Sequence, residues 1–309
     1  MKYSVVQQKL KPWMLPIAIV CGALFHTTLD RVQWLVPYLI FCMLFITFCR
    51  IKPSELKISA MSWYLLAVQL FGSIAVFLLL RPAGLTLAQS AFICVFCPTA
   101  TAAPVVTGML GGSIGRVAAY SFVSNLTVAV TAPFLFLWTG SGNAAAGFVT
   151  EFWDIVAKVA PTILLPAACA FALYYFARPV HDAVDRYQGI SFYLWSVSLL
   201  LVVGKAVSFV MREPASAIPE MICIALVSCL LCLLQFYVGR RIGRRTGDAV
   251  SGAQGLGQKN TVLAVWMTLV YFNPLASIGP AAYIVWQNTI NSGQLYYKMK
   301  REQRSLRTR

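Results

Sequence analysis

The segment Gly255 to Thr261, GLGQKNT, is followed directly by the apolar run VLAVWMTLVYF, so a lysine lies inside a stretch that otherwise suits lipid. A charged side chain at the centre of a bilayer costs about 2.5–3.5 kcal/mol on insertion scales. Lys259 therefore indicates a polar protein interior in which the charge has a partner. The neighbouring glycines weaken a helix at the same place.

The rest of the chain has the composition of a multi-pass membrane protein. Of its 309 residues, 59% are hydrophobic and 11% are charged, which is more apolar than a soluble domain. The net charge of +15 does not indicate nucleic-acid binding, because the basic residues lie beside apolar runs. The nine cysteines lie within or at the ends of these runs, which predicts burial rather than disulfides or a metal site.

A spanning helix needs about 20 mostly apolar residues, and this criterion predicts ten spans. Their residue ranges are 12–27, 32–49, 60–80, 86–110, 116–139, 152–177, 188–211, 217–239, 248–271 and 275–297. The Lys and Arg residues of the loops orient the chain, since only Arg31, Arg81 and Arg212 fall on the side opposite the others. We therefore expect an all-α, multi-pass protein of the cell (inner) membrane with both termini in the cytoplasm.

Two of these spans carry segments that should break a helix. The fourth contains CPTATAAPVVTGMLGG (97–112) and the ninth contains SGAQGLGQKN (251–260). Proline removes a backbone donor and glycine lowers helix propensity. Interrupted helices at corresponding places of two halves predict a substrate site near the middle of the membrane. The alternative is that the small residues only allow close helix packing.

The ten helices divide into two sets of five, and a tandem repeat with an odd number of spans inverts its second copy. We expect the first repeat in residues 1–140 and the inverted second repeat in residues 141–309, which ends in a basic cytoplasmic tail.

These segments resemble those of the bile acid:sodium symporter family. CPTATAAPVVTGMLGG is similar to its fourth-helix signature, GLGQKNTVLAV to its ninth-helix crossing, and IGPAAYIVWQNTINSGQL (278–295) to its final helix. The resemblance implies a panel domain of helices 1, 2, 6 and 7, and a core domain of helices 3–5 and 8–10 in which broken helices 4 and 9 cross. It also implies alternating-access transport of organic anions, normally driven by two sodium ions behind the crossing.

The resemblance also implies a set of site residues. The positions facing the substrate would be Thr99, Thr101, Pro104, Asn260, Gln287 and Asn288. The positions equivalent to the family's cation sites would be Gln69, Ser121, Gly255, Gln258 and Lys259.

Most of the family's sodium ligands are missing from this chain. Its Ser-Asn pair is Ala103-Pro104 here, its helix-5 serine is Val117, its helix-9 glutamate is Gly255, and the following glutamine is Lys259. Sodium, like other hard cations, prefers several oxygen ligands. We therefore do not expect either site to bind sodium, and we expect no other cofactor.

Lys259 suggests what takes the place of the ion. Our hypothesis is that its ammonium substitutes for a bound cation by donating hydrogen bonds to exposed carbonyls and to Gln69. If the lysine gains and loses a proton, transport is coupled to protons; if it stays charged, the protein is a uniporter or an exchanger. The alternative is a lysine that snorkels to the cytoplasmic interface.

The sequence thus predicts a secondary transporter of a bile-acid-like or small carboxylate anion, with the lipid bilayer and its substrate as partners and no required oligomer. It does not predict an enzyme, because paired acids, HExxH and a nucleophile with a base are all missing. The alternatives are a sodium-dependent symporter of the bile-acid type, a membrane sensor that does not transport, and an arsenite-type carrier in which Cys94 or Cys97 would be essential.

Overall fold

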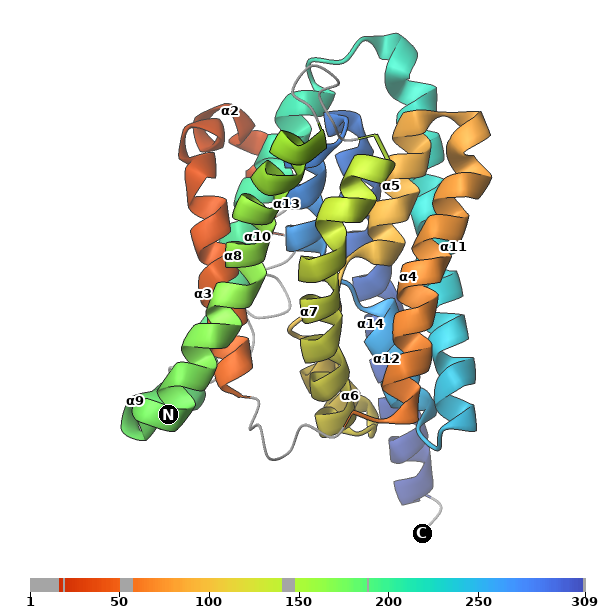
Figure 1. The fold of residues 1–309 in the computed structure, drawn as a ribbon. Coiled ribbons are helices and arrows are strands. Elements are labelled where there is room, and N and C mark those ends of the chain that lie inside the picture. The colour runs from red at the N-terminus through yellow and green to blue at the C-terminus, as the bar shows by residue number, and fades with distance from the viewer. Residues whose placement is uncertain (1–16, 19, 51–57, 141–147, 188, 308–309) are drawn as a thin grey trace. The chain divides into compact units, whose positions relative to one another are not determined.

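The computed structural model describes residues 17–18, 20–50, 58–140, 148–187 and 189–307, and nearly all of them are helical (Figure 1). Within these ranges there is no β-strand, only one isolated β-bridge. The chain is an all-α, multi-pass membrane protein. In the described part of the chain, six helices are long and apolar enough to cross a membrane: His26–Cys49, Ala60–Ala83, Ile114–Trp138, Val149–Phe176, Tyr193–Val210 and Ala215–Arg245.

The chain forms two contact units. Unit 1 consists of Met1–Arg50, Ala132–Ile218 and Val265–Ser277. Its α3 packs against α8 and α10. The elements of unit 1 are α2 (His26–Leu29), η1 (Asp30–Leu35), α3 (Val36–Cys49), α8 (Phe148–Phe176), α9 (Arg178–Arg186), α10 (Gly189–Val210), η4 (Ala215–Ala217) and η5 (Pro274–Ser277).

Unit 2 consists of Ile51–Thr131, Pro219–Ala264 and Ile278–Arg309. It contains most of α7 and the start of α13, whose remaining residues belong to unit 1. Each unit thus combines segments from both halves of the chain, and the division into inverted repeats stays a prediction. The elements of unit 2 are α4 (Ala60–Leu80), η3 (Arg81–Ala83), α5 (Leu85–Phe96), α6 (Ala103–Leu110), α7 (Ile114–Trp138), α11 (Ile218–Arg245), α12 (Ala249–Gly257), α13 (Thr261–Tyr271) and α14 (Ile278–Arg307).

The difference between ten expected spans and six long apolar helices has three sources. The fourth and ninth spans are each divided into two short helices, α5 with α6 and α12 with α13. The last span is present as α14, but it continues to Arg307 through a basic segment that lowers its mean hydropathy. The first span, 12–27, is described only at residues 17–18 and 20–27, which are too few for it to count as a spanning helix.

Unit 1 contains an ion pair between a 3-10 helix and a span. The Nζ atom of Lys205 on α10 lies 2.5 Å from the Oδ1 atom of Asp30, and Arg212 lies 3.9 Å from the other carboxylate oxygen. Both partners of the shorter pair are partly buried. The positive charge of Lys205 is thus balanced by the carboxylate of Asp30.

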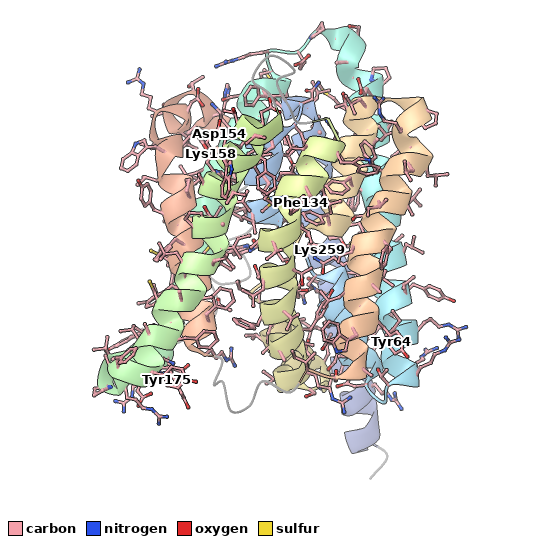
Figure 2. All side chains as sticks on the ribbon, viewed as in Figure 1. Tyr64, Phe134, Asp154, Lys158, Tyr175 and Lys259 are labelled. Atoms are coloured by element: carbon pink, nitrogen blue, oxygen red, sulfur yellow. The ribbon has the colours of Figure 1, made fainter. Side chains whose placement is uncertain are left out.

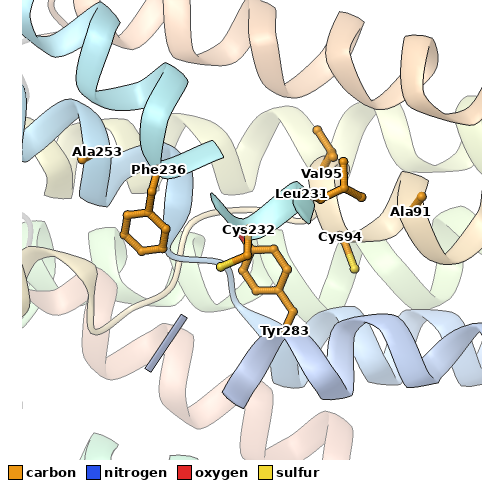
Figure 3. Close-up of a cluster of buried hydrophobic side chains, with 8 residues drawn as sticks. All are labelled: Ala91, Cys94, Val95, Leu231, Cys232, Phe236, Ala253 and Tyr283. Atoms are coloured by element: carbon orange, nitrogen blue, oxygen red, sulfur yellow. The ribbon is translucent and has the colours of Figure 1, made fainter. Parts of the chain in front are cut away.

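In unit 2, α11 and α12 approach each other through glycines. A Cβ atom at Gly252 would lie 2.2 Å from the carbonyl oxygen of Gly239 and 2.7 Å from the Cα atom of Gly243. Only residues without a side chain permit this distance between two helices. A buried cluster then joins α5, α11, α12 and α14, as Figure 3 shows: Ala91, Cys94, Val95, Leu231, Cys232, Phe236, Ala253 and Tyr283.

Asp248 fixes the start of α12 to the start of α7. Its carboxylate accepts hydrogen bonds from the backbone N–H groups of Ser251 and Ser113, both at 2.9 Å, and from the Ser251 hydroxyl at 2.5 Å. Partial burial opposes ionisation of the carboxyl group. These hydrogen bonds and the nearby Arg116 outweigh burial and lower the pKa of Asp248 below its ordinary value.

We expect Gly252→Ala to destabilise the protein by about 1–3 kcal/mol, because the new methyl group overlaps the α11 backbone. The measurement is the thermal unfolding temperature of the purified chain in detergent. Gly115→Ala is the matched control, since a Cβ atom at this helical glycine meets nothing within 4 Å. Its unfolding temperature should be unchanged or slightly higher, and an equal loss in both variants would contradict the packing argument.

The lowered pKa of Asp248 predicts a pH dependence. Its contribution to stability is fully present above the pKa of the unfolded chain, about 3.9, and is lost as the pH falls through the lower folded-state pKa. Asp248→Asn should therefore be less stable than the wild type at pH 7. The difference between the two unfolding temperatures should shrink as the pH is lowered from 5 to 3, and a constant difference would contradict this assignment.

Candidate functional site

Unit 2 contains two interrupted helices. The α5 helix ends at Phe96 and α6 begins at Ala103, while α12 ends at Gly257 and α13 begins at Thr261. The first break follows from Pro98, because a residue before proline avoids the helical region. Cys97 accordingly has φ −53° and ψ 143°.

The two breaks pair with each other as a short antiparallel β-bridge between Thr99 and Lys259. The backbone N–H of Ala100 donates to the carbonyl of Gln258 at 3.0 Å, and the N–H of Asn260 donates to the carbonyl of Pro98 at 2.8 Å. Non-helical backbone is tolerated at membrane depth only where protein or a cavity surrounds it. The bridge and the two hydrogen bonds show that the two broken helices meet within unit 2.

The last carbonyls of α5 are each bound by a side chain from a different element. Gln235 on α11 donates to the carbonyl of Cys94 at 3.2 Å, Lys259 donates through Nζ to that of Val95 at 2.8 Å, and Gln69 on α4 donates to that of Phe96 at 2.7 Å. A helix end leaves four carbonyls without intrahelical partners. Amide and ammonium groups therefore complete the end of this half-helix.

Hydroxyl groups do the same for the end of α12. The Thr99 hydroxyl donates to the carbonyl of Gly255 at 2.7 Å, and the Tyr283 hydroxyl donates to that of Gly257 at 2.8 Å. Tyr283 in turn accepts a hydrogen bond from Gln235 at 3.0 Å. The caps of the two half-helices thus belong to one connected network.

Lys259 is among the most buried large side chains of the described residues, with 1% of its surface exposed. Figure 2 shows it near the middle of the length of α4. Its backbone N–H donates to the side chain of Gln287 at 2.9 Å, and its carbonyl accepts from the same amide at 3.4 Å. The side chain does not reach the protein surface, so the snorkelling interpretation does not describe this structure.

Gln69 is the second organising residue of the crossing. Its carbonyl oxygen accepts from the Tyr120 hydroxyl at 2.9 Å and from the Ser124 hydroxyl at 2.8 Å, both on α7. Its amide nitrogen is directed to Phe96. The hydrogen bond from Lys259 to Gln69 that the sequence suggests is therefore not formed here, and the two side chains instead bind neighbouring carbonyls of α5.

The other residues assigned to the cation positions have different surroundings. The Ser121 hydroxyl donates to the carbonyl of Thr99 at 3.4 Å. Gly255 is packed so closely that a Cβ atom would lie 3.1 Å from both Leu65 and Tyr120. Gln258 is buried and donates to Gln254 on the preceding turn.

The predicted substrate residues fall into two groups. Thr99, Asn260 and Gln287 are buried and bind the backbone of the crossing; Asn260 accepts from the N–H of Leu263 at 3.3 Å and so caps α13. Pro104 is buried in the first turn of α6. The remaining two, Thr101 and Asn288, are only partly buried.

Sequence reasoning missed Gln235, Tyr283, Tyr120 and Ser124. Gln235 could have been found, since it is a single glutamine inside the apolar run of α11, and polar residues within a span generally have a specific partner. Among the described residues, no group of three or more His, Cys, Asp or Glu side chains could hold a metal ion.

A scan against protein-family models finds no match to this chain, and a search of curated proteins finds no relative. The resemblance to the symporter family therefore rests on the sequence segments alone. What the protein does has to be argued from the crossing itself.

We expect Gln69→Leu to lower the thermal unfolding temperature strongly, because it leaves the Phe96 carbonyl and the hydroxyls of Tyr120 and Ser124 without their partner. A buried group left unsatisfied costs about 1–3 kcal/mol. Ser73→Ala is the control on the same helix, since the hydroxyl of this buried serine donates to the carbonyl of Leu70 on α4 itself at 2.7 Å. A loss in Gln69→Leu no larger than in the control would show that the crossing does not depend on Gln69.

Proposed function

We propose that this protein is a secondary transporter of a small organic anion, in which Lys259 replaces a bound cation at the crossing of two broken helices. The observation that carries the proposal is the hydrogen bond from the buried Nζ atom of Lys259 to the carbonyl of Val95. Broken helices that meet at the membrane midplane are typical of substrate sites in secondary transporters. No enzymatic step is part of the proposal.

The electrostatics of the crossing support a cation at this point. The C-terminal end of a helix carries about half a negative charge on its free carbonyls, and α5 and α12 both end here. The resemblance implies that sodium ions neutralise these ends in the symporter family. In this chain Lys259, Gln69 and Thr99 contact the same kind of carbonyls with their own N–H and O–H groups.

The absence of a carboxylate from the crossing supports independence from sodium. Position 255 is a glycine, and a Cβ atom there would already be in tight contact with Leu65 and Tyr120. An acidic side chain at this position would require the side chains of Leu65 and Tyr120 to move. The glutamate that the resemblance implies as a sodium ligand at this position is therefore missing from this chain.

The preference for an anion follows from the same charges. Lys259 supplies a fixed positive group, and α6 and α13 both begin at the crossing, where helix N-termini favour negative groups. The residue before α6, Ala102, offers no side chain to cap that helix. Thr101 and Asn288, which are partly buried, are the side chains we propose for direct contact with the substrate.

The orientation with both termini in the cytoplasm, and the inner membrane as location, belong to this proposal. They rest on the distribution of Lys and Arg between the loops.

A second candidate is supported by one observation. At the two breaks, groups of unit 2 donate hydrogen bonds to the carbonyls of Pro98, Thr99, Ala100, Gln258, Lys259 and Asn260. A crossing that is bonded to itself in this way suits a receptor that keeps the fold but does not cycle. Such a membrane sensor would bind the anion without moving it across the bilayer.

Uptake of labelled taurocholate and pantoate into proteoliposomes, with sodium replaced by choline, tests the proposal. We expect equal initial rates in the two salts, and strict sodium dependence would contradict the role of Lys259. An inward pH gradient separates the coupling modes, because only a proton-coupled carrier is accelerated by it. Binding without uptake would favour the sensor.

Lys259→Gln should reduce uptake on the order of tenfold and lower the unfolding temperature, because hydrogen bonds from charged groups contribute about 1.5–3 kcal/mol. Lys158→Gln is the control, since this lysine lies within the α8 span but is exposed. Figure 2 labels both lysines. Full activity and unchanged stability of Lys259→Gln would leave the buried lysine without the proposed function.

A further inference from the structure

Three helices of unit 2 bring basic side chains to one end of that unit. Arg116 in the first turn of α7 donates to the carbonyl of Thr246, which follows α11, at 3.2 Å. Lys298 on α14 donates to the carbonyl of Met109 near the end of α6 at 2.8 Å. These contacts make the ends of four helices one surface, here called the basic end: Arg116, Arg240, Arg241, Arg244, Arg245, Lys298, Lys300 and Arg301.

Among the described side chains of the basic end, the basic residues outnumber the acidic ones. Among the side chains that the structure describes at this end, Asp248 is the one carboxylate, and its oxygens are engaged by Ser113 and Ser251. In unit 1, by contrast, the two arginines of α9 are offset by Asp182 and Asp185 on the same helix. An orientation signal alone does not require the cations to gather on one unit.

Exposed aromatic residues locate the basic end relative to the bilayer. Trp63, Tyr64, Tyr237, Tyr296 and Tyr297 are all at least 59% exposed. The start of α4 lies beside the end of α11, since Val238 and Ile242 pack against a cluster that includes Met61 and Leu65. Tyrosine and tryptophan gather at the membrane interface, so the arginines and lysines that follow along α11 and α14 lie at the level of the lipid headgroups.

The length of α14 agrees with this placement. Its 30 residues, Ile278–Arg307, span about 45 Å at 1.5 Å per residue, whereas the hydrocarbon core is about 30 Å thick. The last turns therefore extend beyond the hydrocarbon, and Figure 1 shows them projecting past the ends of α6 and α11.

We propose that the basic end of unit 2 binds the phosphate headgroups of anionic phospholipids. Each Lys or Arg near an anionic surface contributes about 1 kcal/mol of attraction, so eight of them form a strong binding surface. The lipids would hold together the outer ends of α6, α11 and α14. Because α6 also forms part of the crossing, lipid binding should stabilise the site from a distance.

The test is the thermal unfolding of the purified full-length chain in detergent with added phosphatidylglycerol or phosphatidylcholine. We expect the unfolding temperature to rise by several degrees with the anionic lipid only, and the rise to disappear at high salt because screening removes the attraction. Glycerol 3-phosphate at the same concentration should have little effect. An equal rise with the neutral lipid, or with the soluble phosphate, would overturn the proposal.

Variants identify the basic residues that are responsible for stabilisation by the anionic lipid. Replacing Arg240, Arg241, Arg244 and Arg245 together by Gln should abolish the rise in unfolding temperature with the anionic lipid. Native mass spectrometry of the same variant should show fewer bound anionic lipids. The double variant Lys300→Gln/Arg301→Gln should reduce the rise in unfolding temperature only partly. It replaces the fourfold variant in the test if the fourfold variant does not fold. Arg178→Gln/Arg186→Gln in unit 1 is the control with the same kind of charge loss, and a loss of the rise there instead would overturn the assignment to unit 2.

Discussion

The backbone pairing between the two breaks is the constraint on which the rest of unit 2 depends. Four helix ends meet at this point, and each would leave N–H and C=O groups without partners in a medium that offers no water. The bridge between Thr99 and Lys259 satisfies part of this requirement. Side chains from α4, α11 and α14 satisfy much of the remainder, so their positions are determined by the carbonyls that they must reach.

This dependence explains why a lysine is tolerated at position 259. Its ammonium lies at the negative end of α5 and binds a carbonyl there, so the helix end compensates part of the cost of burying the charge. A bound sodium ion could play the same electrostatic role, but it would leave and return with the ion concentration. In the transporter proposed above, a tethered ammonium would stay at this position throughout the cycle, so a sodium gradient would not act through it.

Several features of the fold could be predicted from the sequence because local physics determines them. The limits of α4 agree with the expected 60–80, and the break after Phe96 follows from Pro98. The direction of the Lys259 side chain could not be predicted, because it depends on which faces of α4, α5 and α11 meet. The continuation of α14 to Arg307 was missed because hydropathy ends the span, although Lys, Arg, Glu and Gln are good helix formers.

The α12 helix, which ends at the second break, also shows why a count of long apolar helices underestimates the number of segments within the membrane. Every residue of α12 from Ser251 to Gly257 is buried, and glycines bring it against the α11 backbone. Such a helix presents little surface to lipid, so it needs neither length nor hydrophobicity to lie within the membrane. Its composition is free to include Gln254 and the polar segment that follows. The segments with the weakest membrane signal are therefore the ones enclosed by protein, and enclosure is the condition under which a polar site can exist there.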